Sequence, residues 1–593
     1  MFQTSTPSTK IDYNDANGRF IFTVQSWDIG RVRGLPNRRW DARRKTWSAP
    51  AIRANVEYMA AIYKSNVEYS PLAKAKLEEA QIKRTHMHRP SAFPAWYKFK
   101  REPRKAQRAA LEATYGLEAS GLIMDMRTGK TKVVIDTACA YRMEGKIQSV
   151  VLICPLGLRK NWIREFAKDA TIEIDYHLLD TSDKGKAFEK WLHKPHDFKW
   201  LLVGVESFAS GSADKFVERF MLAKGPIYCP VDESSKIKNH AAERSKRVAA
   251  KRKITKYRQI MTGTPIAKGP MDLFMPFEFL DPDIIGLGDF YSFRNRYAVM
   301  GGYEDREIIG YNNMDELMEL LAPFVYQVRQ SDVIDVAEKV RVLREVELSP
   351  EQKKFYKQMR RDKRVDSACG DKSLITQNVL EQMLRLQEIS GGLISYAYTP
   401  EQIDEMKERG IRKPEKFWRE KIPGPNPKLV ELLACCEEYE GQTIVWCTYK
   451  EEIYMVTEAL RDRYGVSQVV DLHGDVDEAQ RDINVYELFQ KKKARFIVGN
   501  AATGGMGLTM DIAENEFYFS NTFNFIDRLQ SEERATAEGK RGVIIVDIVT
   551  RGTVDNTILE ALAAKKNVSD YVRQSIDDKR AAIAAMLGDL DLT

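Results

Sequence analysis

Residues 121–131 read Gly-Leu-Ile-Met-Asp-Met-Arg-Thr-Gly-Lys-Thr, a short apolar run that leads into a tight turn ending in Gly129-Lys130-Thr131. The run predicts a buried strand, and the turn predicts the start of a helix. Backbone N–H groups at such a start cradle phosphate, a Lys neutralises β/γ charge, and a Thr hydroxyl binds Mg2+. The stretch therefore predicts an α/β fold with a phosphate loop. Taken alone, it is also compatible with a chance Gly-Lys-Thr, because Met124 replaces the first consensus Gly.

Length and composition limit the class of protein. The chain has 593 residues, enough for several domains, and 43% of them are hydrophobic, which supports large cores. It has no run of 18 or more apolar residues and no secretory signal, so we expect no membrane span and a cytoplasmic setting, in a bacterial or virus-infected host cell. The seven cysteines are sparse, and the adjacent pair Cys435-Cys436 does not suit structural zinc.

Positive charge is concentrated near the start of the chain. Residues 1–110 hold 22 Lys and Arg against 9 Asp and Glu, a net +13, whereas the whole chain carries +7. A basic front on a near-neutral body predicts a polyanionic partner. A basic surface that is merely solvated is the alternative.

Apolar strands alternate with helical segments in two stretches of the chain, which is typical of α/β layers. The segment between these stretches reads as helical and charged, and a final helix is expected over Asp555–Leu587. Strands are predicted at Gly121–Met124, Val150–Cys154, Trp200–Val205, Ile227–Val231, Thr443–Cys447, Arg495–Gly499, Glu516–Phe519 and Gly542–Ile548. The expected domains are a basic module at 1–92, a first lobe at 93–281, protrusions and a linker at 282–425, a second lobe at 426–560 and a C-terminal helix at 561–593.

An acidic pair, Asp232-Glu233, directly follows the predicted strand Ile227–Val231. At the carboxyl end of a strand, an Asp can hold Mg2+ through water, and a Glu can orient or deprotonate the attacking water. The pair therefore predicts ATP hydrolysis. The alternative is an ordinary helix N-cap, because Asp and Ser both cap helices well.

A turn at Met261-Thr262-Gly263-Thr264-Pro265 follows another apolar stretch. Its small hydroxyl residues, Thr264 among them, could bond both the acidic pair and DNA. An ordinary Gly-Pro turn is the alternative. Ala502–Leu508, which includes Thr503 and Gly507, is a glycine-rich turn suited to a close approach of the backbone to phosphate.

Gln530-Ser531-Glu532-Glu533-Arg534 is predicted to open a helix in the second lobe. Such a helix could aim Arg534 at the ATP site, where an arginine that stabilises charge on the γ-phosphate supplies about 10³–10⁵ in rate. A surface arginine on an Arg/Glu helix face is the alternative.

The densest basic stretch is Leu35–Pro50, in which two strand-like pieces flank the turn Asp41-Ala42-Arg43-Arg44-Lys45. Arg and Lys can bind phosphates, while Trp offers a stacking face to an unpaired base. The predicted DNA-binding residues of this stretch are Arg38, Arg39, Trp40, Arg43, Arg44, Lys45 and Trp47. The alternative is that both tryptophans belong to the core of a small domain.

From about residue 100 to 560 the chain resembles the Swi/Snf-like ATPases of helicase superfamily two. The motifs that carry the resemblance are Pro103–Gln107, Asp125–Thr131, Ile153–Leu156 with Asn161-Trp162, Asp232–Asn239, Thr262–Ile266, Glu347–Gln352, Ala502–Leu508 and Gln530–Arg534. The resemblance implies two RecA-like lobes with helical protrusions between them, a small basic α+β module in front, ATP and Mg2+ as cofactors, and tracking along duplex DNA.

The resemblance also implies roles for single residues. Arg104 and Gln107 read adenine, and Asp232 positions the metal while Glu233 activates water. Gln530 and Arg534 complete the catalytic set. The other ATP contacts are Arg127, Thr128, Gly129, Lys130, Thr131 and Gly507, with Thr131 also on the metal and Thr264 and Thr503 on DNA.

Some positions depart from the family pattern. Arg127 stands where the family usually has Gly, and Ser234 and Ser235 replace the usual Ala-His or Gly-His. The second arginine of the last motif is Ala537, for which Lys540 or Arg541 could substitute. We therefore expect ATP turnover to depend on Arg534, the arginine of the last motif that matches the family pattern.

Residues 20–59 look like the HARP domain of fork-remodelling members of the same family, which implies recognition of branched DNA. We therefore expect a DNA-dependent ATPase, a monomeric duplex translocase that remodels branched DNA in repair, recombination or replication, by branch migration, fork regression or strand annealing. A motor that displaces proteins or RNA polymerase from DNA is one alternative. An ATP-gated DNA-binding scaffold with little turnover is another, supported only by Ala537.

Overall fold

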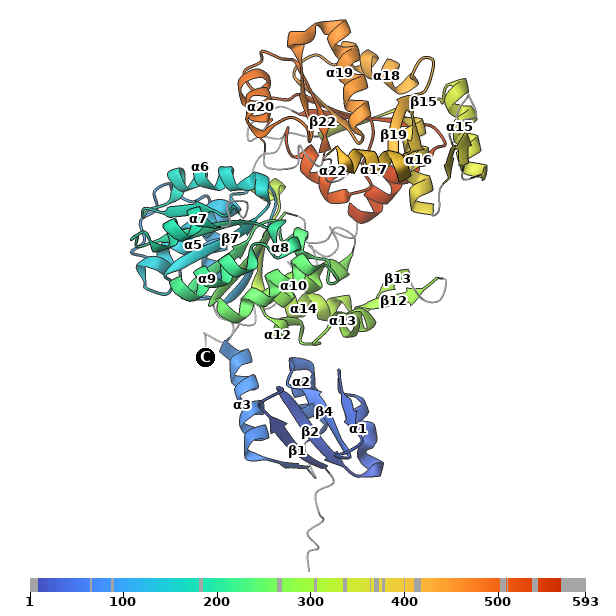
Figure 1. Ribbon diagram of the computed structural model, residues 1–593. Helices are drawn as coiled ribbons and strands as arrows, with labels where there is room; N and C mark the ends of the chain where they lie inside the picture. The colour runs from blue at the N-terminus through green and yellow to red at the C-terminus, as the bar shows by residue number, and fades with distance from the viewer. Residues whose placement is uncertain are drawn as a thin grey trace, which may run out of the picture. The chain divides into compact units, whose positions relative to one another are not determined.

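The computed structural model describes residues 9–566 apart from 64–66, 87–89, 181–184, 264–268, 303–306, 334–338, 363, 367–372, 376–378, 399, 410–416, 502–507, 509 and 536–541. The chain forms two compact units, one ending at Val333 and the other beginning at Ile334. Figure 1 traces their elements.

The N-terminal module is a five-stranded mixed sheet ordered β3-β4-β2-β1-β5. Its strands are β1 Thr9–Asn14, β2 Arg19–Val24, β3 Arg39–Asp41, β4 Thr46–Pro50 and β5 Val67–Tyr69, with helices α1 Ile29–Arg33, α2 Arg53–Ile62 and α3 Pro71–His86. Alternate residues of β1 are buried, as the two-residue period of a strand covered on one face requires. Phe20, Phe22 and Met59 are fully buried in its core.

A seven-stranded sheet follows in the first unit, and all its neighbouring strands run parallel in the order β14-β6-β11-β10-β7-β9-β8. The strands are β6 Ala119–Met124, β7 Ser149–Cys154, β8 Asp175–Leu178, β9 Lys199–Gly204, β10 Ile227–Val231, β11 Tyr257–Thr262 and β14 Val325–Val328. The central strands are buried along their whole length, which explains their continuous apolar sequence.

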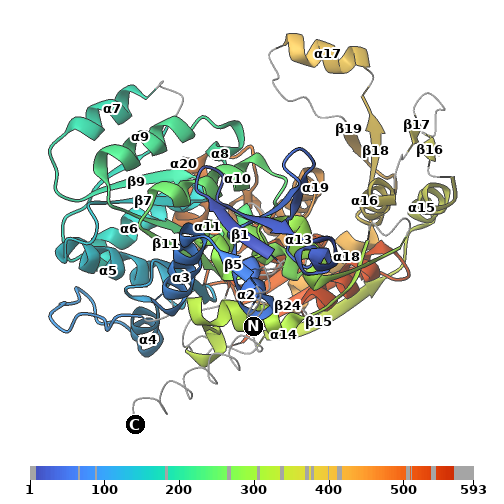
Figure 2. The ribbon, with the colours of Figure 1, turned by 90° about the horizontal axis from the view of Figure 1, so that it is seen from below.

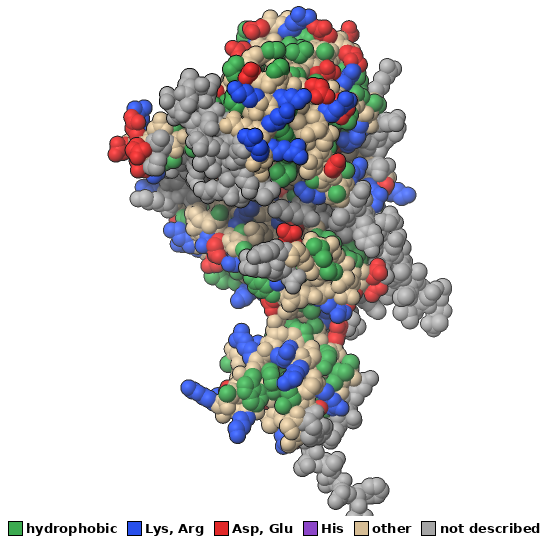
Figure 3. Space-filling view, turned by 90° about the vertical axis from the view of Figure 1, so that its right-hand side faces the viewer, with side chains coloured by type: hydrophobic (Ala, Val, Ile, Leu, Met, Phe, Trp, Pro, Cys, Tyr) green, Lys and Arg blue, Asp and Glu red, His purple; other side chains and the backbone are tan. Residues whose placement is uncertain are grey.

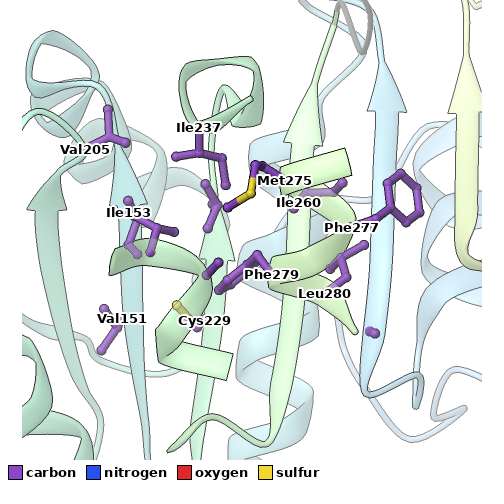
Figure 4. Packing of buried hydrophobic residues seen from close by; sticks show 14 of the residues in the cluster. Val151, Ile153, Val205, Cys229, Ile237, Ile260, Met275, Phe277, Phe279 and Leu280 are labelled. Carbon is purple, nitrogen blue, oxygen red and sulfur yellow. The ribbon is translucent and has the colours of Figure 1, made fainter. Parts of the chain in front are cut away.

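Helices cover both faces of this sheet (Figure 2). They are α4 Lys105–Thr114, α5 Lys130–Met143, α6 Arg159–Asp169, α7 Lys186–His193, α8 Ser207–Ser210, α9 Asp214–Lys224, α10 Glu243–Ala250 and α11 Phe274–Leu280. One apolar cluster joins α4, α5 and α6 to one face, and a second joins α7, α9, α10 and α11 to the other. Figure 4 shows part of the second cluster, in which Phe279 and Leu280 lie near Ile260 of β11 and Cys229 of β10. The sheet is therefore a rigid base for the loops at its strand ends.

The segment after residue 281 mixes helices with strands. It contains α12 Pro282–Ile285, α13 Phe290–Tyr297, α14 Met314–Leu321, α15 Pro350–Asp362, α16 Val379–Ser390 and α17 Pro400–Glu408. Three antiparallel strand pairs lie among them: β12 Ala298–Gly301 with β13 Glu307–Tyr311, β16 Arg364–Asp366 with β17 Ser373–Ile375, and β18 Leu393–Ala397 with β19 Phe417–Lys421. These strands were not predicted from the sequence, and each is only three to five residues long.

The second unit contains a six-stranded sheet, again with all neighbouring strands parallel, in the order β15-β24-β23-β20-β22-β21. The strands are β15 Lys339–Val346, β20 Thr443–Cys447, β21 Val469–Leu472, β22 Phe496–Asn500, β23 Asn515–Tyr518 and β24 Val543–Thr550. Helices α18 Pro427–Glu438, α19 Lys450–Tyr464, α20 Glu478–Asp482 and α22 Phe525–Glu532 accompany it, with a π-helical stretch at Ile483–Phe489.

The fold is the predicted one: α/β, with two parallel-sheet lobes and a small α+β module in front. All eight predicted strands are present, with ends that differ by at most two residues. β15 is an edge strand and alternates charged with apolar residues. It therefore lacks the continuous apolar run from which the other strands were predicted. The predicted final helix is seen over residues 554–566, and its remainder lies outside the described residues. No helix in the described part of the chain has the length and apolarity needed to cross a membrane.

Candidate nucleotide and DNA sites

The phosphate loop lies between β6 and α5, as the sequence predicts. Gly129 is the N-cap of α5 and has a φ of +93°, a left-handed conformation that favours glycine. A Cβ at this position would lie 1.8 Å from Nε2 of Gln107. Arg127, where the family usually has Gly, also takes a left-handed φ of 64°. The absence of a Cβ at Gly129 therefore lets the Gln107 amide lie against the loop.

Gln107 ties α4 to this loop. It is buried, and its Oε1 accepts a 2.8 Å hydrogen bond from the backbone N–H of Arg104, the N-cap residue of α4. Its amide nitrogen points at Gly129. The structure thus places Arg104 and Gln107, the two residues predicted to read adenine, next to the phosphate loop.

The side chains of the loop converge on its backbone carbonyls. Nζ of Lys130 donates to Met124 O at 2.6 Å and to Asp125 O at 3.1 Å. Thr128 is fully buried, and its hydroxyl donates to Asp125 O at 2.7 Å. Thr131 is the second residue of α5 and is half-buried. The Lys ammonium and the Thr hydroxyl therefore lie at the helix start, where N–H groups and the helix dipole favour an anion.

The acidic pair follows β10, which is separated from β6 only by β11. Oδ2 of Asp232 accepts a 2.9 Å hydrogen bond from Nε1 of Trp162, and Oδ1 accepts one of 3.0 Å from the backbone N–H of Glu233. Glu233 is buried and has a left-handed φ of 50°. Trp162 appeared in the sequence analysis only as part of a motif, and no local signal marks it as the partner of Asp232.

Electrostatics couples the acidic pair to the phosphate loop. Burial raises the pKa of Asp232, while the Lys130 ammonium and the Trp162 hydrogen bond oppose that rise. Lys130 is therefore close enough to stabilise the Asp232 carboxylate. An opposite charge and a hydrogen bond are the two influences that keep a buried Asp ionised.

These residues fit a nucleotide with its magnesium ion. The start of α5 at Gly129 offers backbone N–H groups to phosphate, and Lys130, the first residue of the helix, supplies positive charge there. The Thr131 hydroxyl and the Asp232 carboxylate are the oxygen donors that Mg2+ prefers. Among the described residues, no cluster of three or more His, Cys, Asp or Glu offers a site held by protein ligands alone. The donor set suits a metal that is bound partly through phosphate.

In the second unit, the Gln530–Arg534 stretch ends a helix and does not open one, which corrects the prediction. α22 begins after Asn524, whose side chain accepts from the backbone N–H of Ile526, so the N-cap lies upstream of the expected start. Gln530 lies in the last turn, and Arg534 follows the helix. Arg534 is buried, and its Nη1 donates to Leu508 O at 2.9 Å. It is therefore not a surface arginine.

Glu532, two residues before Arg534 in the chain, is the buried centre of a charged network that was not predicted from the sequence. Glu532 accepts two hydrogen bonds from Arg341, of 2.9 and 2.6 Å, and one from Arg528 of 2.8 Å. Burial alone would raise the pKa of Glu532, but Arg528 and Arg341 lower it to about 2. Glu516 accepts from the backbone N–H of Ala535 at 3.2 Å, and burial raises its pKa to about 7. These contacts fix the backbone on both sides of Arg534.

The predicted DNA-binding stretch forms the β3–β4 hairpin of the N-terminal module, which we call the basic hairpin (residues 38–47). Its exposed cationic side chains are Arg38, Arg39, Arg43, Arg44 and Lys45. Oδ1 of Asp41 accepts from the backbone N–H groups of Arg43 and Arg44, at 2.9 and 3.1 Å, which shapes the turn. Figure 3 shows Lys and Arg side chains standing out on the module, the body at the bottom of that view.

The two tryptophans of the basic hairpin differ in exposure. Trp40 is 49% exposed, whereas Trp47 is half-buried against the core of the module. Their ring centroids lie 5.2 Å apart. Of the two rings, that of Trp40 is exposed enough to stack on a base. Trp47 instead fits the alternative, in which the ring belongs to the core of the module. Thr264, Thr503 and Gly507, together with Ala537, Lys540 and Arg541, lie outside the described residues.

Comparison with known proteins agrees with this geometry. A model of the SNF2-related domain matches residues 54–391, which is more than half of the chain. The chain belongs to the SNF2-related family. This membership confirms the Swi/Snf-like resemblance, and the HARP-like character of the module stays a prediction.

SNF2-related proteins of known name share low identity with this chain. YwqA of Bacillus subtilis, whose name proposes an ATP-dependent helicase/translocase, is 25% identical over 464 residues, which are 76% of this chain and 46% of that protein. The transcription regulatory protein SNF2 of Saccharomyces cerevisiae is 22% identical, over 77% and 26%. The DNA repair and recombination protein RDH54 of the same species is 23% identical, over 72% and 45%. The chain thus spans less than half the length of these relatives.

Among solved structures, the Sulfolobus solfataricus SWI2/SNF2 ATPase core in complex with dsDNA is similar, with 19% identity and a TM-score of 0.34. The match covers 82% of this chain and 97% of that one. A second structure of the Sulfolobus solfataricus SWI2/SNF2 ATPase core domain also has 19% identity and a TM-score of 0.34.

Proposed function

We propose that this protein is a DNA-dependent ATPase that translocates along duplex DNA. The observation that carries the proposal is the coupling of the phosphate loop to the acidic pair within one lobe. Asp232 is buried, bonded to Trp162 and stabilised by Lys130. A buried carboxylate beside a phosphate loop, with an ammonium and a hydrogen bond that favour its charged form, suits a group that positions a metal for phosphoryl transfer.

ATP and Mg2+ are the proposed cofactors. Gln107 and Arg104 read adenine, the α5 N-terminus with Lys130 binds phosphate, and Thr131 and Asp232 hold the metal. When bound, the ion neutralises charge that builds up on the transferred phosphoryl group. Glu233 orients or deprotonates the attacking water. Gln530 and Arg534 of the second unit belong to the same catalytic set in this proposal.

The proposed substrate is double-stranded DNA with a branch or junction. The basic hairpin combines exposed cations with the exposed ring of Trp40, which suits phosphate on one side and an unpaired base on the other. A junction offers both features at one place. On this basis we propose a HARP-like role for the module, with branch migration, fork regression or strand annealing as the outcome of translocation.

A motor that displaces proteins from linear duplex is the second candidate. The same ATP-site geometry fits such a motor, but a linear duplex has no unpaired base on which the exposed Trp40 ring could stack. The scaffold with little turnover is less well supported, because Lys130, Asp232 and Glu233 are all in place.

The discriminating experiment is ATP turnover by the purified chain with single-stranded, linear duplex and forked DNA of equal length. The proposal predicts turnover that duplex DNA stimulates and forked DNA stimulates further. Equal stimulation by linear and forked duplex favours the protein-displacing motor. Binding of DNA with no turnover on any substrate favours the scaffold.

A further inference from the structure

The start of the basic hairpin is hydrogen-bonded to the first α/β lobe. Asn37 directly precedes Arg38 and takes a left-handed φ of 55°. Its Nδ2 donates to Leu287 O at 3.0 Å, and its Oδ1 accepts from the Ser292 hydroxyl of α13 at 3.2 Å. Both polar atoms of this amide therefore bond to residues between 287 and 292, which run from the loop after α12 into the first turn of α13.

Helix α2 of the module contacts the same segment. Nη2 of Arg53 donates to Ile285 O at 3.1 Å, and the backbone N–H of Ala54 donates to Gly286 O at 3.1 Å. Residues 285–292 thus contact two separate parts of the module, the residue before the basic hairpin and helix α2. We call this segment the socket.

Two glycines make the socket a close fit. Gly286 and Gly288 have left-handed φ values of +72° and +84°. A Cβ on Gly286 would lie 2.6 Å from Cβ of Arg53, and a Cβ on Gly288 would lie 2.6 Å from Nδ2 of Asn37. Real side chains do not approach this closely, so the module is fitted to a surface that only glycine leaves open.

The socket continues into the loop that carries the acidic pair. Phe290, the first residue of α13, stacks on His240 with ring centroids 3.5 Å apart and an interplanar angle of 9°. His240 lies seven residues after Glu233 in the chain, beyond the buried turn Ser234–Ile237. A shift of α13 would therefore press on the segment that positions Glu233.

We propose that the socket couples the basic hairpin to ATP hydrolysis, so that DNA held by the hairpin raises turnover through α13 and His240. This inference rests on the proposed function. It assigns Asn37, Arg53 and His240 as positioning residues that contact neither DNA nor nucleotide.

The test measures junction binding and turnover separately in three socket variants: Asn37→Ala, Arg53→Ala and His240→Ala. Each should keep turnover on linear duplex and affinity for forked DNA, and lose the extra stimulation by forked DNA. Typical coupling energies correspond to a factor of ~5–150, so the loss should be at least ~5-fold where wild-type stimulation is that large.

Matched controls separate coupling from loss of structure. His240→Phe keeps an aromatic ring against Phe290 and should restore stimulation that His240→Ala loses. Gly286→Ala should behave as the socket variants do. Gly145→Ala carries the same left-handed strain, with φ of +69° and no atom within 4 Å of its added Cβ, and should leave fork stimulation unchanged.

The outcomes distinguish the inference from the proposed function. Normal fork stimulation in Asn37→Ala and Arg53→Ala would overturn the coupling while leaving the ATPase assignment intact. Loss of stimulation that His240→Phe fails to restore would overturn the path through α13. Absence of DNA-stimulated turnover in the wild type would overturn the proposed function and the coupling with it.

Discussion

The indole Nε1 of Trp162 donates a buried hydrogen bond of 2.9 Å to Oδ2 of Asp232, joining α6 to the end of β10. This bond opposes the rise in the Asp232 pKa that burial causes. Trp162 therefore holds the proposed metal-positioning carboxylate in place and favours its charged form.

Replacing Trp162 by Phe removes this hydrogen bond but keeps most of the buried ring. Hydrogen bonds to charged groups contribute about 1.5–3 kcal/mol, so we expect the rate of ATP turnover to fall by ~10-fold or more, with the optimum moved to higher pH as the Asp232 pKa rises. Steady-state turnover against pH measures both effects.

Trp200→Phe is the control for Trp162→Phe. Trp200 is also fully buried, and its Nε1 has no hydrogen-bond partner in the part of the chain that the structure describes. This variant should lower stability slightly and leave the pH profile of turnover unchanged. An unchanged profile in Trp162→Phe as well would contradict the role given to the indole.

Alanine at Arg38, Arg39, Arg43, Arg44 and Lys45 should reduce the salt dependence of DNA binding. Each phosphate neutralised contributes about −0.9 to the slope of log affinity against log salt, so losing these contacts flattens the slope. Fork affinity should fall more than basal turnover on long linear duplex. Fluorescence anisotropy over a salt series gives the slope, with Arg33→Ala/Lys74→Ala as a charge control elsewhere on the module. Equal losses for fork and duplex would make the hairpin a general clamp.

Arg534→Ala tests the proposed arginine finger. An arginine acting on the transition state supplies about 10³–10⁵ in rate, so turnover should drop by a large part of that factor while nucleotide binding weakens far less. Single-turnover kinetics and nucleotide titration separate the two. Arg534→Lys keeps a point charge but not the planar fork, and we expect only partial recovery. Near-normal turnover in Arg534→Ala, with loss in Lys540→Ala or Arg541→Ala, would move the finger along the chain.

Glu516→Gln should stabilise the protein at high pH relative to the wild type. Burial raises the pKa of Glu516 from 4.5 to about 7, so its stability contribution is complete below pH 4.5 and is lost as pH rises through 7. The loss corresponds to about 3 kcal/mol above that range, which the neutral amide avoids. Thermal unfolding at pH 5 and pH 8 checks this, with the exposed Glu514→Gln as control. An equal difference between variant and wild type at both pH values would refute it.

The sequence predicted the parts of this protein that local patterns encode. Buried parallel strands such as β6 and β10 are continuous apolar runs, and the phosphate loop and acidic pair follow them at fixed spacing. β15 was missed because only pairing with β24 makes its alternating sequence a strand. The helix at Gln530–Arg534 was misplaced because its N-cap, Asn524, lies upstream of the motif.

Contacts between residues far apart in the chain could not be predicted. Trp162 with Asp232 and Asn37 with Ser292 depend on the packing of elements 70 and 255 residues apart. The exposure of Trp40 and the burial of Trp47 likewise depend on which face of the module is covered. Sequence patterns indicate what such residues can do, whereas the fold decides which of them meet.

The most direct test of the account is ATP turnover by the wild type, Lys130→Ala and Glu233→Gln, each with and without duplex DNA. Lys130→Ala removes the ammonium proposed to neutralise charge on the β/γ-phosphates, and Glu233→Gln removes the carboxylate proposed to activate water. On this account we expect DNA-stimulated turnover in the wild type, abolished in both variants, with DNA binding largely retained. Turnover by Glu233→Gln close to that of the wild type, or a wild type that duplex DNA does not stimulate, would contradict it.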